Sequence, residues 1–134
     1  MGAWGIGNFD NDSAGDWTYE LGESSDLTVI ENAINAVFED DYIDSDIGCE
    51  ALAAIDTLAR VKGNFGKKDS YTENVDEWVS KYNFEPPKEL IENAVKAAKA
   101  ILGDQSELSD IWRATEYFDA WRIEVESVIE RVGA

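Results

Sequence analysis

The chain has 134 residues, with 29 acidic against 11 basic side chains, a formal net charge of −18, no histidine and one cysteine. This length predicts a single helical domain over 1–134, because a chain of this size can bury about two-thirds of its unfolded surface. The charge argues against binding nucleic acid or an anionic membrane, and a lone cysteine excludes an internal disulfide. Without histidine, the commonest general base and metal ligand is missing, so catalysis is disfavoured.

The apolar side chains recur at three- and four-residue steps, which predicts six helices in chain order. The predicted helices cover 12–21, 25–39, 44–62, 75–82, 88–102 and one long final helix from Ser106 or Ser109 almost to the C-terminus. No segment alternates apolar and polar residues as a strand does. The expected fold class is therefore all-α: a compact bundle of about five or six helices, with an N-terminal Gly/Trp/Phe arm docked on it.

The final helix carries two tryptophans, Trp112 and Trp121, each followed by an arginine. Nine residues correspond to about two and a half helical turns, so these rings are expected on opposite faces of one helix. Both are interpreted as packing residues. The arginines are expected to pair with nearby acids such as Asp110, Asp119 and Glu126.

The opening MGAWGIGNFDND combines glycines, two large rings and a run of polar residues. An arm this short cannot form its own core, so Trp4 and Phe9 are expected to dock in a groove of the bundle. Gly5 and Gly7 would let the backbone run close to the helices. Asp10, Asn11 or Asp12 would cap the first helix. Trp4→Ala is then expected to cost about 3–5 kcal/mol.

A calcium loop is an alternative reading of the same region. With Asp10 at position one, Asp12 falls at three, Gly15 at six and Asp16 at seven, but Leu21 stands where a bidentate glutamate is needed. The alternative function is accordingly a carboxylate- or divalent-metal-dependent enzyme that uses Asp10, Asp12 and Asp16. No complete metal-ligand set and no cofactor motif is predicted.

The acidic residues are concentrated in the first 59 positions, which hold 14 acids and neither Lys nor Arg. Within them, the segment EDDYIDSDIGCE over 39–50 surrounds an aromatic ring with six acids. Such a segment is typical of a docking surface for a basic partner, and a solvated turn between helices remains an equal alternative. The candidate partner-binding residues are Glu39, Asp40, Asp41, Tyr42, Asp44, Asp46 and Glu50.

The expected function is a non-catalytic, acidic, protein-binding domain. An immunity-type inhibitor of a basic nuclease toxin and a nucleic-acid mimic both fit, since each would dock a basic protein. No signal peptide and no apolar run long enough to span a membrane is visible, so a cytoplasmic location is expected.

The opening G-x-W-G-x-G-x-F-D-N-D, here Gly2 through Asp12, resembles the signature of the bacterial family called domain of unknown function 4259. The stretch Glu50 to Ala54 and the spacing of Leu108, Trp112 and Trp121 are similar to that family too. Asp56 departs from it, because a glutamate is expected there. The resemblance implies a small, acidic, cytosolic bacterial domain and no known activity.

Overall fold

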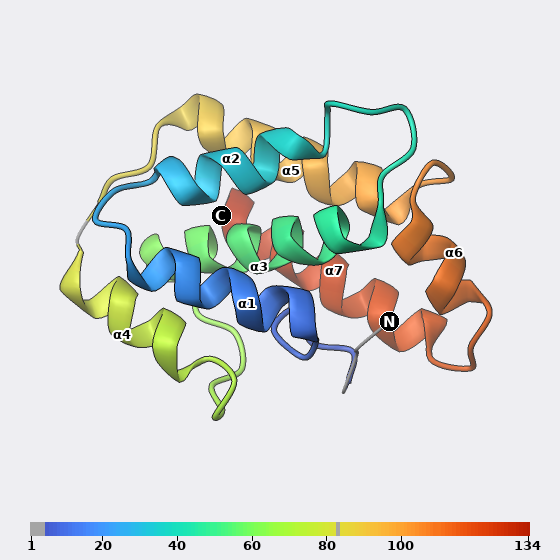
Figure 1. The fold of residues 1–134 in the computed structure, drawn as a ribbon, viewed down its shortest axis with the longest axis horizontal. Helices are drawn as coiled ribbons and strands as arrows, with labels where there is room; N and C mark the ends of the chain where they lie inside the picture. Colours follow the sequence, from blue (N-terminus) through green and yellow to red (C-terminus); the bar gives the residue numbers. More distant parts are fainter. Residues whose placement is uncertain (1–4, 83) are drawn as a thin grey trace.

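The computed structural model describes residues 5–82 and 84–134, in which helices are joined by turns and loops and one isolated bridge links Ile43 to Ser106. Its seven helices are α1 (Asp12–Gly22), α2 (Thr28–Ala36), α3 (Ser45–Val61), α4 (Glu73–Lys81), α5 (Lys88–Leu102), α6 (Glu107–Arg113) and α7 (Phe118–Gly133) (Figure 1). The predicted all-α class is confirmed. Within the described residues, none of the helices is long and apolar enough to cross a membrane.

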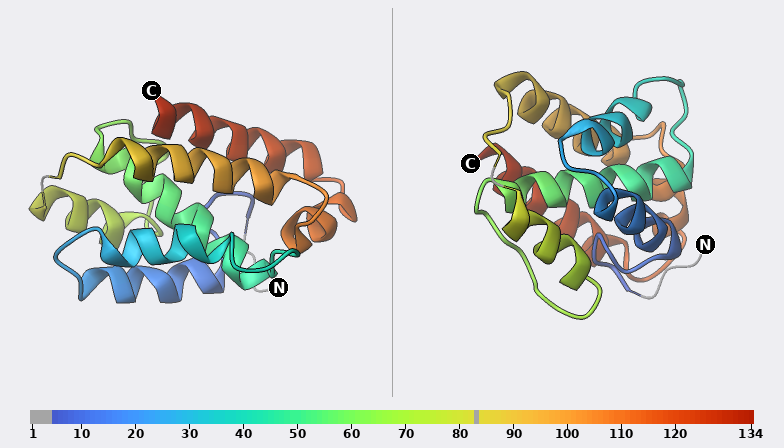
Figure 2. Two further views of the ribbon diagram at one scale, coloured as in Figure 1. Left: turned by 90° about the horizontal axis from the view of Figure 1, so that it is seen from above. Right: turned by 60° about the vertical axis from the view of Figure 1, so that its left-hand side comes forward.

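Helix α3 is the centre of the bundle. It contacts each of the other six helices that the described residues form, and Figure 2 shows it running between α5 and α7 on one side and α1 and α2 on the other. Every residue from 51 to 60 is buried as a result. Small side chains such as Ala53 and Ala54 let the neighbouring helices approach, and Ile55 and Leu58 fill the remaining core.

Local capping explains where several helices begin. The Asn11 side chain accepts a hydrogen bond from the Ala14 amide at 2.8 Å, and the Asp44 carboxylate accepts one from the Asp46 amide at 2.8 Å. Helix α2 begins only at Thr28, whose amide donates to Asp26 at 2.9 Å, and it ends at Ala36. It is shorter than predicted, since the acids at 39–41 would oppose the negative C-terminal end of its dipole.

The prediction of a single final helix is wrong, and this adds the seventh helix. The chain turns between α6 and α7 at 114–117, where the Thr115 hydroxyl donates to the Trp112 carbonyl at 2.8 Å and accepts from the Tyr117 amide at 3.1 Å. A threonine hydroxyl that bonds nearby backbone groups competes with helix continuation. Trp112 and Trp121 consequently stack with ring centroids 6.2 Å apart and planes at 12°, instead of facing opposite sides.

Candidate functional site

The opening motif holds the chain close to the bundle through side chains that fold back on their own backbone. The Gly7 amide donates to an Asp10 carboxylate oxygen at 3.1 Å. A Cβ atom at Gly7 would lie 2.6 Å from that oxygen, and one at Gly5 would lie 2.8 Å from it. The close approach of the Asp10 carboxylate therefore explains both glycines. Trp4, the other expected anchor of the arm, lies outside the described residues.

Phe9 docks in the bundle as the sequence predicts, since its side chain is only 4% exposed and belongs to the hydrophobic core. The guanidinium of Arg60 lies over the Phe9 ring, 5.4 Å from its centroid. This cation–π contact places the arm directly beside a charged group that is itself buried.

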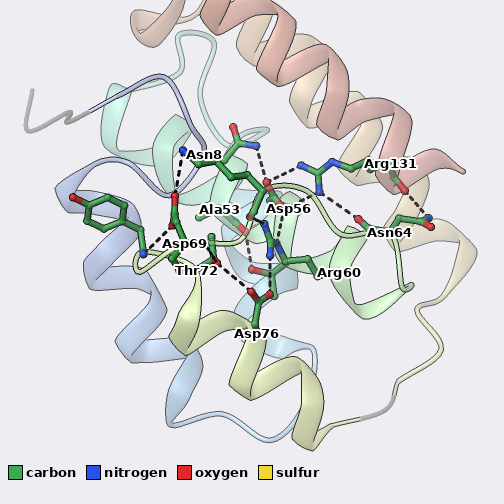
Figure 3. A network of polar contacts seen from close by, with 12 residues as sticks. Asn8, Ala53, Asp56, Arg60, Asn64, Asp69, Thr72, Asp76 and Arg131 are labelled. Atoms are coloured by element: carbon green, nitrogen blue, oxygen red, sulfur yellow. Dashed lines mark hydrogen bonds and ion pairs between the residues drawn. The ribbon is translucent and has the colours of Figure 1, made fainter.

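A buried polar network begins where the arm meets α3 (Figure 3). The carboxylate of Asp56 accepts hydrogen bonds from Asn8 Nδ2 at 2.9 Å and from Arg60 Nε at 2.9 Å. Both terminal nitrogens of Arg131, in α7, donate hydrogen bonds to the same carboxylate, at 3.0 Å and 2.9 Å. One side chain of α3 thus joins the N-terminal arm to α7.

Arg60 extends this network to α4 and to the loop before it. Its Nη1 atom bonds Asp76 at 2.7 Å and its Nη2 atom donates to the Lys67 carbonyl at 2.6 Å. All three donor nitrogens of the guanidinium are therefore satisfied, as a buried charge requires. Burial alone would raise the pKa of Asp56, but the hydrogen bonds and charge of Arg131, the hydrogen bond from Asn8 and the charge of Arg60 hold it below its ordinary value.

This network was not predicted from the sequence. Its signal was an Asp–Arg pair four residues apart, Asp56 and Arg60, inside a helical stretch that is otherwise almost continuously apolar. Such spacing places both side chains on one helix face, and their position in a buried stretch requires them to be paired.

The exposed acids of α1 and those at the start of α3 form one surface, which we call the acidic face: Asp12, Asp16, Glu20, Glu23, Asp44, Asp46 and Glu50. The Ser13 hydroxyl bridges the two helices by donating to Asp46 at 2.8 Å. The pKa of Glu50 is raised, first by partial burial and then by the negative charges of Glu20, Asp46, Asp16 and Asp44. The carboxylates of both helices are thus close enough to repel one another.

No ion pair between the described residues compensates this surface. Of the acids in the first 59 residues, only Asp56 takes part in such a pair. The exposed arginines pair locally instead, Arg113 with Asp110 and Arg122 with Asp119 and Glu126, as expected from the sequence. The acidic face is therefore exposed to solvent without a neutralising partner from the described chain.

The structure divides the predicted partner-binding segment in two. Asp44, Asp46 and Glu50 join the acidic face. Glu39, Asp40 and Asp41 lie exposed in the connection between α2 and α3, beside the end of α5. Tyr42 is turned toward α6, where its hydroxyl donates to Asp110 at 2.7 Å, a bond that raises the pKa of Tyr42 to about 12.

Residues 2–124 match the family described as Domain of unknown function (DUF4259). The chain belongs to this family. Searches of the curated proteins and of the solved structures found no match. The family thus covers the arm, the buried network as far as α3 and α4, and the whole acidic face, but it assigns no reaction to any of them.

The alternative metal-dependent site gains no geometric support. Asp10 is turned to the Gly7 amide, whereas Asp12 and Asp16 lie one turn apart on the exposed side of α1. Across residues 5–82 and 84–134, no group of three metal-ligating side chains is placed to hold an ion. Cys49 is buried, and burial followed by the charges of Asp46, Glu50 and Asp44 raises its pKa to about 12, which makes it a poor nucleophile.

Proposed function

We propose that this protein is a non-catalytic domain that binds a basic partner protein through the acidic face. One observation carries the proposal: the acids of α1 and of the start of α3 lie on one surface, where Ser13 joins the two helices by donating to Asp46 at 2.8 Å, and no described lysine or arginine forms an ion pair with them. Like charges held together in this way destabilise the free protein. A partner that brings Lys and Arg to this face would relieve the repulsion.

The proposed partner is a protein, because the acidic face extends over both α1 and the first turns of α3. An uncompensated negative surface also speeds encounter with a positive one. Two forms of this function fit a cytoplasmic bacterial domain: an immunity-type inhibitor that covers a basic nuclease, and a mimic that occupies a nucleic-acid-binding protein.

The test is capture of a basic protein from source-cell lysate at low salt, followed by affinity measurements on the purified partner. The variant Asp16→Asn/Glu20→Gln/Glu50→Gln should weaken binding by about 3- to 150-fold, since each of the three exposed pairs that it removes contributes roughly 0.2–1 kcal/mol. The matched control, Glu89→Gln/Glu92→Gln/Glu116→Gln, removes the same charge from α5 and from the turn before α7. It should bind like the wild type.

If both triple variants lose the same affinity for the partner, binding depends only on net charge. That result would refute the proposed site. If binding is specific, duplex DNA added as a competitor separates the two forms. A nucleic-acid mimic is displaced from its partner by DNA. An inhibitor that covers a nuclease elsewhere is not displaced, and it suppresses the nuclease activity directly.

A further inference from the structure

Tyr19 stands out on the exposed side of α1. Its side chain is 70% exposed, more than any other large apolar or aromatic side chain in the described residues. At 100° per residue it falls with Asp12, Asp16, Glu20 and Glu23 in a stripe about 100° wide. The aromatic ring of Tyr19 thus lies at one edge of the stripe of acids on α1.

A hollow of about 430 Å³ opens beside this ring, between α1 and the turn that precedes α4. Asp12 and Asp16 line one wall and Phe9 closes part of the hollow, while Ser70 and Asn74 contribute from the other side. No lysine or arginine lines it among the described residues. The volume is large enough for a long side chain, and its charged groups are all anionic.

Across Tyr19 lies a second hollow, of about 350 Å³, lined by Glu23 and Glu77. Here a cation is already present, because Lys81 lines the hollow and pairs with Glu77 at 3.3 Å. The two hollows differ in this respect. Of these two hollows, the one lined by Asp12 and Asp16 has no lysine or arginine in its described lining.

Elsewhere in the described chain, an aromatic ring and two carboxylates together bind an arginine side chain. Arg113 lies over the ring of Phe118, 5.4 Å from its centroid, while its guanidinium pairs with Asp104 and Asp110. A guanidinium is planar, so it can stack on a ring and donate to carboxylates at the same time. An ammonium group can also lie over a ring, as Lys68 does over Phe65 at 4.4 Å, but it has no planar fork that can donate to two carboxylate oxygens while it is stacked.

We propose that the hollow beside Tyr19 receives an arginine side chain of the basic partner, whose guanidinium stacks on Tyr19 and bonds Asp12 or Asp16. This inference rests on the proposed function and gives it a recognition chemistry. The complementarity is that of a cation meeting two uncompensated carboxylates and a ring face. The arginine would fix the orientation of a partner that the rest of the acidic face attracts less specifically.

The test uses two acetylated model peptides, one with two arginines and one with two lysines at the same positions, titrated into ¹⁵N-labelled protein at low salt. The arginine peptide should bind more tightly, with amide shifts concentrated at Gly15, Tyr19 and Asn74. Tyr19→Leu should weaken its binding by about two- to fivefold, the range for an exposed cation–π contact. Tyr19→Phe keeps the ring and should bind like the wild type.

The control is Tyr117→Leu, because Tyr117 is a similarly exposed tyrosine at the start of α7, outside the acidic face. It should leave arginine-peptide binding unchanged. Equal affinity for both peptides, or shifts at Asp46 and Glu50 with none around Tyr19, would overturn the arginine site and leave the proposed function standing. Absence of any shift with either peptide would contradict both.

Discussion

At the scale of single residues, Asp56 is a buried carboxylate at the centre of the polar network. It is buried, it carries a charge, and its carboxylate is shared by Asn8, Arg60 and Arg131. A charge in such a position costs desolvation energy that only a complete set of partners repays. Removal of one member of the network would therefore leave the others buried without that partner, which destabilises the fold.

Asp56→Asn should lower the free energy of unfolding by about 3–5 kcal/mol, because it leaves two guanidinium groups without their shared carboxylate. Urea denaturation followed by circular dichroism measures this change. Asp119→Asn, which removes an exposed partner of Arg122 at 3.7 Å, should change stability by less than about 0.5 kcal/mol. Similar effects of the two substitutions would contradict the role given to the network.

The same carboxylate predicts a dependence on pH. Because the pKa of Asp56 is lower in the folded than in the unfolded chain, its stabilisation is present above the unfolded pKa, at about pH 4, and is lost as pH falls below it. The difference in stability between the wild type and Asp56→Asn should therefore stay nearly constant from pH 6 to about pH 5 and shrink as the pH falls below about 4. A difference that stays constant below about pH 4 would argue against a charged Asp56.

Glu50 behaves in the opposite sense. Its folded pKa is raised, so its ionisation opposes folding once the pH exceeds the unfolded value. Glu50→Gln should consequently raise Tm at pH 7 and have little effect at low pH, where the carboxyl is protonated in both states. Calorimetry at the two pH values measures this, with exposed Glu116→Gln as the control. A lower Tm at pH 7 would refute the repulsion within the acidic face.

At the scale of elements, the turn between α6 and α7 determines how the aromatic residues pack. Because the chain bends at 114–117, Trp112 and Trp121 stack on each other, and Phe118 lies 5.9 Å from the second ring. Trp112 is also buried. These ring contacts therefore hold α6 against α7 next to the turn that joins them.

Trp112→Ala should cost about 3–5 kcal/mol of stability, as expected for a buried large aromatic. It should also remove the exciton couplet that two stacked indoles give in circular dichroism, which a single-helix arrangement with opposed rings would not produce. Trp78, whose Nε1 donates to the Ser24 carbonyl far from this stack, provides a reference. Trp78→Phe should leave the couplet in place.

Helical periodicity predicted most elements to within a few residues, because α1, α3, α4 and α5 each carry a regular apolar stripe. The break at Thr115 was not predictable in this way, since a threonine is tolerated inside many helices and only its hydrogen bonds show that it turns the chain. The candidate site was likewise only partly predictable from the sequence. The acids were visible in the sequence, but the proximity of Glu20 to Glu50 depends on how α1 crosses α3.

At the scale of the whole molecule, charge is distributed unevenly. Figure 2 shows α1, which carries exposed acids, on the opposite side of α3 from α5, the helix that carries the exposed lysines Lys88, Lys96 and Lys99. With a net charge of −18, the molecule is under repulsive stress that is greatest on one side.

Added salt should therefore raise Tm at pH 7, since the repulsion between exposed carboxylates is screened over about 8–10 Å at physiological ionic strength. The rise should be smaller in Asp16→Asn/Glu20→Gln/Glu50→Gln than in Glu89→Gln/Glu92→Gln/Glu116→Gln, although both carry the same net charge. Thermal unfolding monitored across a sodium chloride series checks this. Identical salt dependence would mean that the repulsion is spread evenly over the surface.

The ion pair between Arg131 and Asp56 can form only late in the synthesis of the chain. The two residues are 75 positions apart, so a ribosome that adds about 5–20 residues per second completes the aspartate's surroundings roughly 4–15 seconds after making it. Until then the nascent chain must keep a charged side chain of its central helix hydrated. The core around α3 can therefore exclude water only after α7 has been synthesised.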